Sequence, residues 1–223
     1  MEHIKKLFIS KFETLFILGA ISTISIILLM VRMKLTSSYF FLFLVWNLFL
    51  AMIPFAITTY IQTKKKIKGI RLWLMLLMWL LFLPNAPYII TDIIHLQHSK
   101  SGILDTLLVG SFAIAGLCFY FNSLKDFKNI ISVKLSKKVI SLLIIGIHFL
   151  VGFGIYLGRF LRFNSWDIIK DPLSLGIEIL NIILYPSEHR LAWFVTFGFG
   201  IGLLIIEEII LNFKKRNHLF TFE

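Results

Sequence analysis

Long uncharged stretches recur along the chain and are separated by short polar segments. Six of them are mostly apolar: Thr14–Val31, Leu35–Thr63, Leu72–Thr91, Thr106–Leu124, Val139–Gly158 and Leu191–Ile206. A helix that crosses a bilayer needs about 20 such residues, because lipid offers no partner to exposed backbone groups. The alternation over about ten residues that marks a barrel strand is absent. The pattern predicts an all-α, polytopic membrane helix bundle in a single domain, 1–223, with six transmembrane helices at about 14–31, 39–61, 72–91, 104–122, 139–158 and 191–211.

Composition also favours a membrane environment. Of the 223 residues, 58% are hydrophobic and only 16% are charged, and the mean hydropathy is +0.86. A soluble domain carries about 25% charged residues. This excess of apolar residues argues against a cytosolic enzyme and against a disordered chain. Cys118 is the only cysteine, which excludes an intrachain disulfide framework.

The distribution of lysine and arginine predicts the orientation. Six spans place both termini on one side of the membrane, and that side carries 16 of the 23 cations, against 7 on the other. Cytoplasmic loops are enriched in these residues, so both termini are expected in the cytoplasm. Topology and contact with anionic membrane lipids then explain the net charge of +11, and no nucleic acid is expected as a partner. The first apolar run is too long for a signal peptide and is expected to stay in the protein as a helix.

The third span carries two prolines near its outer end. Pro84 and Pro87 each lack an N–H and clash with the carbonyl four residues back, which predicts a kink or break in the helix. The freed carbonyls and the Asn85 amide need partners there, with Tyr88 close by. Broken membrane helices often line a cavity. The alternative is a purely structural kink that neighbouring helices cap.

Beyond the prolines, Asp92 and His95 are spaced to lie on one helix face at the outer boundary. A carboxylate beside an imidazole can serve as acid and base, which makes these two residues the candidate catalytic pair. With His98 they could instead ligate a divalent metal, although Asp-x-x-His alone is a weak signal. The alternative is that the histidines are solvated loop residues. No cofactor is predicted.

The fifth span ends in Gly158-Arg159-Phe160-Leu161-Arg162, where the two arginines are expected to share a helix face at the outer interface. Cations are disfavoured on that side, and guanidinium forks bind phosphate or carboxylate, so Arg159 and Arg162 are candidate anion-binding residues. Asn164 and Asp167 are candidate supporting residues. The alternative is an internal ion pair of the arginines with Asp92, Asp167 or Asp171.

Two further features lie in the second half of the chain. His148 falls near the middle of the fifth span, where an ionisable side chain is costly and normally faces protein or water. It is either a functional residue or a neutral imidazole bonded to a neighbouring helix. Asp171-Pro172 reads as a helix start, and the segment at about 172–185 is too short to span. It is expected to form an outer interfacial helix.

Three segments resemble a known family. They are LVWNLFLAMIPF, WLLFLPNAPYIITDIIHL and YLGRFLRFNSWD, and they resemble the bacterial membrane family catalogued as domain of unknown function 1361. The resemblance runs from about Phe40 to the last span. It implies a polytopic protein of the bacterial cytoplasmic membrane and carries over no catalytic residue.

Three functions are compatible with these residues. The favoured one is a polar site at the outer membrane face that binds or processes an anionic, lipid-linked or envelope substrate. A small-solute or ion-coupled transporter is an alternative, as is a non-catalytic membrane assembly partner. His-Glu-x-x-His, Gly-x-Ser-x-Gly, phosphate-loop and dinucleotide motifs are missing from the sequence, so it leaves open whether the protein is an enzyme. No protein partner is indicated.

Overall fold

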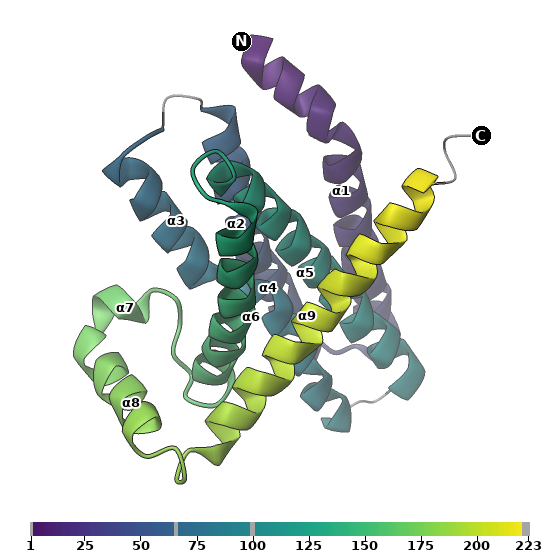
Figure 1. Ribbon diagram of the computed structural model, residues 1–223. Helices are drawn as coiled ribbons and strands as arrows, with labels where there is room; N and C mark the ends of the chain where they lie inside the picture. The colour runs from purple at the N-terminus through teal and green to yellow at the C-terminus, as the bar shows by residue number, and fades with distance from the viewer. Residues whose placement is uncertain (1, 65–66, 99–100, 220–223) are drawn as a thin grey trace. The chain divides into compact units, whose positions relative to one another are not determined.

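The computed structural model describes residues 2–64, 67–98 and 101–219, and the chain divides into two compact units, Met1–Lys134 (unit 1) and Leu135–Glu223 (unit 2). No strand occurs in the described ranges (Figure 1). In unit 1 the α-helices and the 3-10 helices (η) are α1 Glu2–Thr36, η1 Phe40–Leu42, α2 Phe43–Thr63, α3 Ile70–Phe82, α4 Asn85–Tyr88, η2 Ile89–His98 and α5 Gly102–Ile131. In unit 2 they are α6 Lys137–Arg159, α7 Asp167–Lys170, α8 Pro172–Leu184 and α9 Arg190–Leu219.

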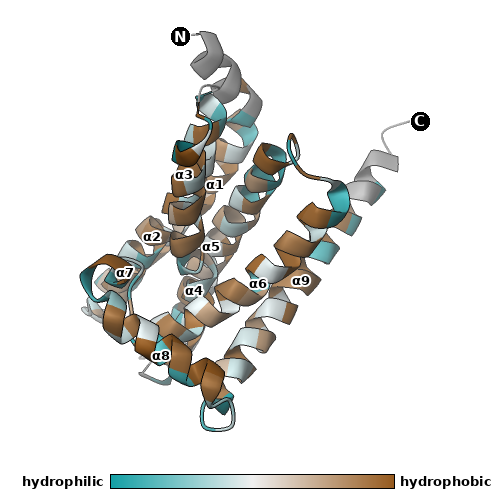
Figure 2. Cartoon of the chain, turned by 60° about the vertical axis from the view of Figure 1, so that its left-hand side comes forward, coloured by the Kyte–Doolittle hydropathy of each residue, from teal (hydrophilic) through white to brown (hydrophobic). Residues whose placement is uncertain are grey.

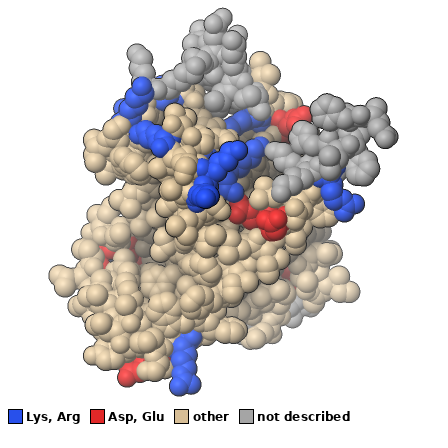
Figure 3. All heavy atoms as spheres, in the orientation of Figure 1, with Lys and Arg blue, Asp and Glu red and all other residues tan. Residues whose placement is uncertain are grey.

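The predicted six-span architecture is confirmed. Six stretches of the described residues are long and apolar enough to cross a membrane: Lys11–Thr36, Phe40–Thr63, Ile70–Gln97, Gly102–Ile131, Lys137–Arg159 and Arg190–Phe213. Most exceed the uncharged runs that predicted them, because charged residues such as Arg32 and Asp126 lie inside helices and are paired there. Apolar residues dominate the long helices (Figure 2), and charged residues are few over the lower part of the face in Figure 3. The chain is a multi-pass integral membrane protein, while its description as a single domain stays a prediction.

Helix α5 is the centre of unit 1. It packs against α1, α2, α4 and η2. Phe112 and Leu108 on α5 are fully buried, and Phe119 contacts Phe55 of α2 with ring centroids 6.0 Å apart. Lipid is as apolar as these side chains, so close packing and hydrogen bonds hold membrane helices together. The helices of unit 1 therefore depend on the polar contacts that link them to α5.

Polar contacts join α1 to both ends of α5. Lys11 forms an ion pair with Asp126 and donates to Thr59 of α2 at 3.2 Å. At the other end of α1, Arg32 pairs with Asp105 near the start of α5. The residue numbers along the two helices run in opposite directions, so α1 is antiparallel to α5. This is the relation that alternating membrane crossings require of the first and fourth spans.

A tryptophan connects α3 to α5. Trp79 is 1% exposed, and its Nε1 donates to Ser123 Oγ at 2.6 Å. Its ring stacks on Phe127 with centroids 4.3 Å apart and planes 10° from parallel. An indole N–H buried in a bundle needs such an acceptor. The two contacts hold the apolar helix that leads toward the prolines.

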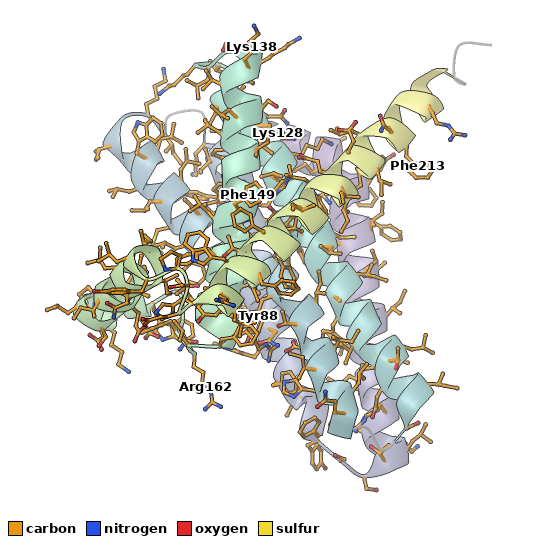
Figure 4. All side chains as sticks on the ribbon, turned by 60° about the horizontal axis from the view of Figure 1, so that its bottom comes forward. Tyr88, Lys128, Lys138, Phe149, Arg162 and Phe213 are labelled. Carbon is orange, nitrogen blue, oxygen red and sulfur yellow. The ribbon has the colours of Figure 1, made fainter. Side chains whose placement is uncertain are left out.

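In unit 2, α6 and α9 pack as an antiparallel pair. Gly152 of α6 faces Thr196, and a Cβ placed on Gly152 would lie 2.5 Å from the Thr196 carbonyl oxygen. Four residues further along α9, Gly200 lies against the ring of Phe149, which is labelled on α6 in Figure 4. Small residues let two membrane helices approach closely. Glycine at these two positions therefore sets the distance between α6 and α9.

The helix predicted at 172–185 is present as α8. Asp171 is its N-cap and accepts from the Ser174 amide at 3.2 Å, and Pro172 occupies the first turn, as predicted. Its thirteen residues give about 20 Å of helix, too short to span a bilayer. Its exposed leucine and isoleucine residues are Leu173, Ile177, Leu180, Ile183 and Leu184, and all of them except Ile183 lie along one stripe. Its location in the outer interface stays a prediction.

Candidate functional site

The third span breaks at the two prolines, as predicted. Helix α3 ends at Phe82, and the chain continues through the short α4 into the 3-10 helix η2. The Asn85 side-chain amide donates to the Phe82 carbonyl oxygen at 2.9 Å, and the Tyr88 amide donates to the carbonyl of Pro84 at 3.0 Å. The carbonyls freed by the prolines were predicted to need partners, and the Asn85 side chain is one of them. It caps the broken end of α3.

A glycine brings this broken segment close to α5. A Cβ on Gly116 would lie 2.3 Å from the carbonyl oxygen of Ala86 in α4. Real Cβ atoms do not approach an oxygen so closely, so only glycine fits here without a shift of the backbone. The contact between α4 and α5 sets where η2 begins, and η2 carries the candidate catalytic pair.

Asp92 and His95 lie together on η2. A 3-10 helix has about three residues per turn, so side chains at i and i+3 stand one above the other. His95 Nε2 lies 4.0 Å from Asp92 Oδ1. The carboxylate is buried, with 1% of the Asp92 side chain exposed, whereas 32% of the His95 side chain is exposed. The predicted pairing of these residues is present, with the imidazole on the accessible side.

Asn47 of α2 also contacts the carboxylate. Its Nδ2 donates to Asp92 Oδ2 at 2.8 Å. An asparagine within an apolar span predicts a hydrogen bond between helices, and this bond is present. Its partner could not be predicted from spacing, because 45 residues separate the two positions. The bond joins Asp92 of η2 to α2.

Two phenyl rings hold the imidazole of His95. The Phe43 ring centroid lies 5.1 Å from that of His95 at 66°, and the Phe40 centroid lies 5.9 Å away at 77°. Both are edge-to-face arrangements, which aromatic rings prefer over flat stacking. Together with Asp92, three side chains lie against His95. The ring is therefore oriented before any ligand arrives.

A buried ion pair lies at the same end of unit 1. Arg32 Nε donates to Asp105 Oδ1 at 2.8 Å, and Nη2 lies 3.4 Å from Oδ2. Arg32 also donates to the Ser38 carbonyl at 2.9 Å and lies 4.7 Å above the ring of Phe41. The two charged side chains are 1% and 0% exposed. The pairing of Arg32 with Asp105 was not predicted from the sequence. An arginine on the outer side nevertheless indicates that a carboxylate partner is needed.

The arrangement around His95 suits acid–base chemistry or anion recognition. A carboxylate that faces one ring nitrogen orients an imidazole, which can then exchange a proton or a hydrogen bond with a substrate. In the part of the chain that the structure describes, no three His, Cys, Asp or Glu side chains gather to hold an ion, and metal ligation that includes His98 stays a prediction. The His98 side chain lies outside the described part.

The two arginines of unit 2 do not share a helix face, contrary to the prediction. Helix α6 ends at Arg159, and Arg162 follows in a turn with a left-handed backbone, φ +62°. A residue with a side chain is uncommon in this region and incurs strain. Arg162 is exposed, and in Figure 4 its side chain points away from the ribbon. Its guanidinium makes no hydrogen bond or ion pair with the described residues.

Asn164 and Asp167 form a local turn next to the arginines. Asp167 Oδ2 accepts from the Asn164 backbone amide at 2.7 Å and from its side-chain amide at 3.3 Å. This carboxylate therefore caps the turn before α7, and Asp171 caps α8. Asp167 and Asp171 were both alternatives as ion-pair partners of the arginines, and each of them makes a local capping contact.

His148 is fully buried in α6 and contacts an acid. Its Nε2 lies 3.1 Å from Glu207 Oε2 on α9. The imidazole is therefore bonded to a neighbouring helix, and its role as a supporting site residue stays a prediction. Glu207 was missed as its partner because it lies at the boundary of the last uncharged run, 59 residues away. Among the predicted site residues, Asn85, Tyr88, Asp92 and His95 thus belong to unit 1, whereas Arg159, Arg162, Asn164, Asp167 and His148 belong to unit 2.

Comparison with known proteins gives one family. A family model described as "Protein of unknown function (DUF1361)" matches residues 46–206. The match includes Asn47, Asp92, His95 and Arg162. No curated protein and no solved structure matches the chain.

Proposed function

The chain belongs to this DUF1361 family, and we propose that it binds or processes an anionic, lipid-linked or other envelope substrate at the outer face of a bacterial cytoplasmic membrane. The excess of lysine and arginine on the side of the termini supports cytoplasmic ends and an outer location for Asp92 and His95.

The observation that carries the proposal is the environment of His95. Its imidazole is partly exposed, faces a buried carboxylate and is held by two phenyl rings. The buried Asp92 carboxylate accepts from Asn47 and faces His95, as a buried carboxylate needs such partners. In this arrangement Asp92 orients the imidazole of His95. In this proposal His95 touches the substrate, and Asp92 positions the imidazole of His95.

Arg162 supports the anionic character of the substrate. It is exposed, and its backbone holds a conformation that costs about 1–3 kcal/mol in a residue with a side chain. Arginine recognises phosphate with two parallel hydrogen bonds. Arg159 at the end of α6 and Arg162 are the anion-binding residues of the proposal, and the predicted alternation of the spans supports an outer location for them as for His95.

Binding of a defined probe tests the proposal. The protein in lipid nanodiscs would be mixed with a polyprenyl phosphate and, separately, with the uncharged polyprenol. We expect the phosphate to bind more tightly, and Arg162→Gln and His95→Ala each to weaken its binding about tenfold, the effect of losing one charge-assisted hydrogen bond. Lys170→Gln and His189→Ala are matched controls on the same predicted side and should leave the Kd within twofold. Equal affinities for phosphate and alcohol would refute the proposal.

A transporter is the second candidate, and the contact between His148 and Glu207 is the observation that favours it. Ionisable residues inside membrane spans often mark ion or proton pathways. Uptake of solutes into proteoliposomes that responds to an imposed gradient would favour this function over the first.

A further inference from the structure

Arg32 holds the connection between α1 and α2 in place. Its Nη1 donates to the carbonyl oxygen of Ser38 at 2.9 Å, and its guanidinium carbon lies 4.7 Å from the centroid of the Phe41 ring. The other two nitrogens, Nε and Nη2, face the oxygens of Asp105 on α5 at 2.8 and 3.4 Å. A planar guanidinium that is bonded on two sides and stacked on a ring has little freedom to turn. Arg32 therefore fixes residues 38–41 relative to α1 and α5.

The backbone at the start of this connection is strained. Ser37 has a left-handed φ of +48°, which is uncommon for a residue with a side chain. Such a conformation persists only where the surrounding contacts enforce it. Two bonds hold the next residue: Arg32 donates to the Ser38 carbonyl, and the Phe40 amide donates to Ser38 Oγ at 3.4 Å. Without the bond from Arg32 the turn would relax, and the rings that follow it would move.

Those rings lead directly to the candidate catalytic imidazole. The Phe41 ring is fully buried, and its centroid lies 5.0 Å from that of Phe40 and 6.2 Å from that of Phe43. Phe40 and Phe43 are also 6.2 Å apart, and they are the two rings that hold His95. Side chains in a packed interior leave few voids, so one ring cannot shift without displacing its neighbours. The position of Phe41 therefore decides how Phe40 and Phe43 lie against His95.

From this chain of contacts we infer that Arg32 is a positioning residue for His95, which sets the orientation of the imidazole through Phe41 and the two neighbouring phenyl rings. Arg32 itself is 1% exposed and touches no substrate. The consequence for ligand binding rests on the function proposed above, whereas the orientation of the ring can be measured without a ligand.

NMR of the histidine rings tests the orientation directly. The protein would carry 13C-labelled histidine in lipid nanodiscs, and His95→Gln would identify the His95 signal as the one that disappears. Arg32→Lys keeps the positive charge beside Asp105, but an ammonium lacks the planar fork that bonds Asp105 and Ser38 while stacking on Phe41. We expect Arg32→Lys to shift the His95 ring signal and to leave the signals of His148 and His189 in unit 2 unchanged.

Two phenylalanine variants provide the comparison. Phe41→Leu removes the ring between Arg32 and the two phenyl rings and should also shift the His95 signal. Phe119→Leu is the matched control: its ring is 4% exposed and packs on Phe55 at 6.0 Å, but it lies roughly 21 Å along α5 from Asp105. It should leave the His95 signal in place. An unchanged His95 signal in Arg32→Lys overturns the inference, as does an equal shift in Phe119→Leu. Should Arg32→Lys not fold, Phe41→Leu decides in its place.

Binding of polyprenyl phosphate measures the consequence for the site. Arg32→Lys should raise the Kd about threefold, near the lower end of the effect of one aromatic contact and less than the tenfold expected for His95→Ala, because the imidazole is present but turned. Phe119→Leu should leave the Kd within twofold. If His95→Ala weakens binding and Arg32→Lys does not, the inference is wrong. If the parent protein does not prefer the phosphate to the alcohol, the proposed function fails, and the His95 signals still decide the positioning role.

Discussion

Removing one partner of the buried Arg32–Asp105 pair should strongly destabilise the protein. Arg32→Met keeps the length of the side chain but removes hydrogen bonds of 2.8, 3.4 and 2.9 Å to Asp105 and Ser38. The Asp105 carboxylate would remain at 0% exposure without this cation. Breaking a buried pair from one side costs about 3–5 kcal/mol, which we expect as the loss in free energy of unfolding.

The double variant separates this mechanism from simple loss of packing. Arg32→Met with Asp105→Leu leaves no buried charge at this place, and replacing both partners is often neutral. The double variant should therefore lose less stability than Arg32→Met alone, which gives a coupling energy of at least about 2 kcal/mol. The assay is reversible unfolding in mixed micelles with increasing dodecyl sulfate, followed by circular dichroism.

An exposed arginine provides the control. Arg71→Met makes the same chemical change at an exposed position near the start of α3 and should stay within about 0.5 kcal/mol of the parent protein. The reasoning is refuted if Arg32→Met costs less than about 1 kcal/mol, or if the costs of the two single substitutions add up in the double variant.

Two further predictions concern packing and topology. Gly116→Ala should cost about 1–3 kcal/mol in the same unfolding assay, because its new methyl group meets the backbone of α4. Gly110→Ala on the same helix meets nothing within 4 Å and should be neutral or stabilising; equal effects would contradict the packing argument. With Cys118 replaced by serine, an impermeant maleimide applied to intact cells should label Ser187→Cys and spare Val133→Cys, and the reverse pattern would invert the topology.

The spans were predictable because the bilayer imposes a length on every apolar run. Asp92 and His95 were predictable as a pair because local helical spacing decides which neighbours meet. The contacts of Arg32 with Asp105 and of His148 with Glu207 were not, since 73 and 59 residues separate the partners and only helix packing brings them together. Periodicity placed Arg162 on a helix that had already ended at Arg159.

The proline break also shows where spacing is informative and where it is not. Two prolines predict the end of an α-helix, and α3 does end there. They do not predict that the chain then winds as a ten-residue 3-10 helix, which depends on tertiary contacts such as the close approach of Ala86 to Gly116. The candidate site thus combines a local pattern with packing that no local pattern encodes.

The ion pairs between α1 and α5 also affect when unit 1 can pack during translation. Lys11 and Arg32 are translated 115 and 73 residues before their acidic partners. At about 5–20 residues per second, the longer interval lasts roughly 6–23 s. During this time the first helix carries two cations whose carboxylates do not yet exist. Unit 1 therefore reaches its final packing only after α5 has left the ribosome, and the nascent first span must meanwhile keep both charges near head groups, water or the insertion machinery.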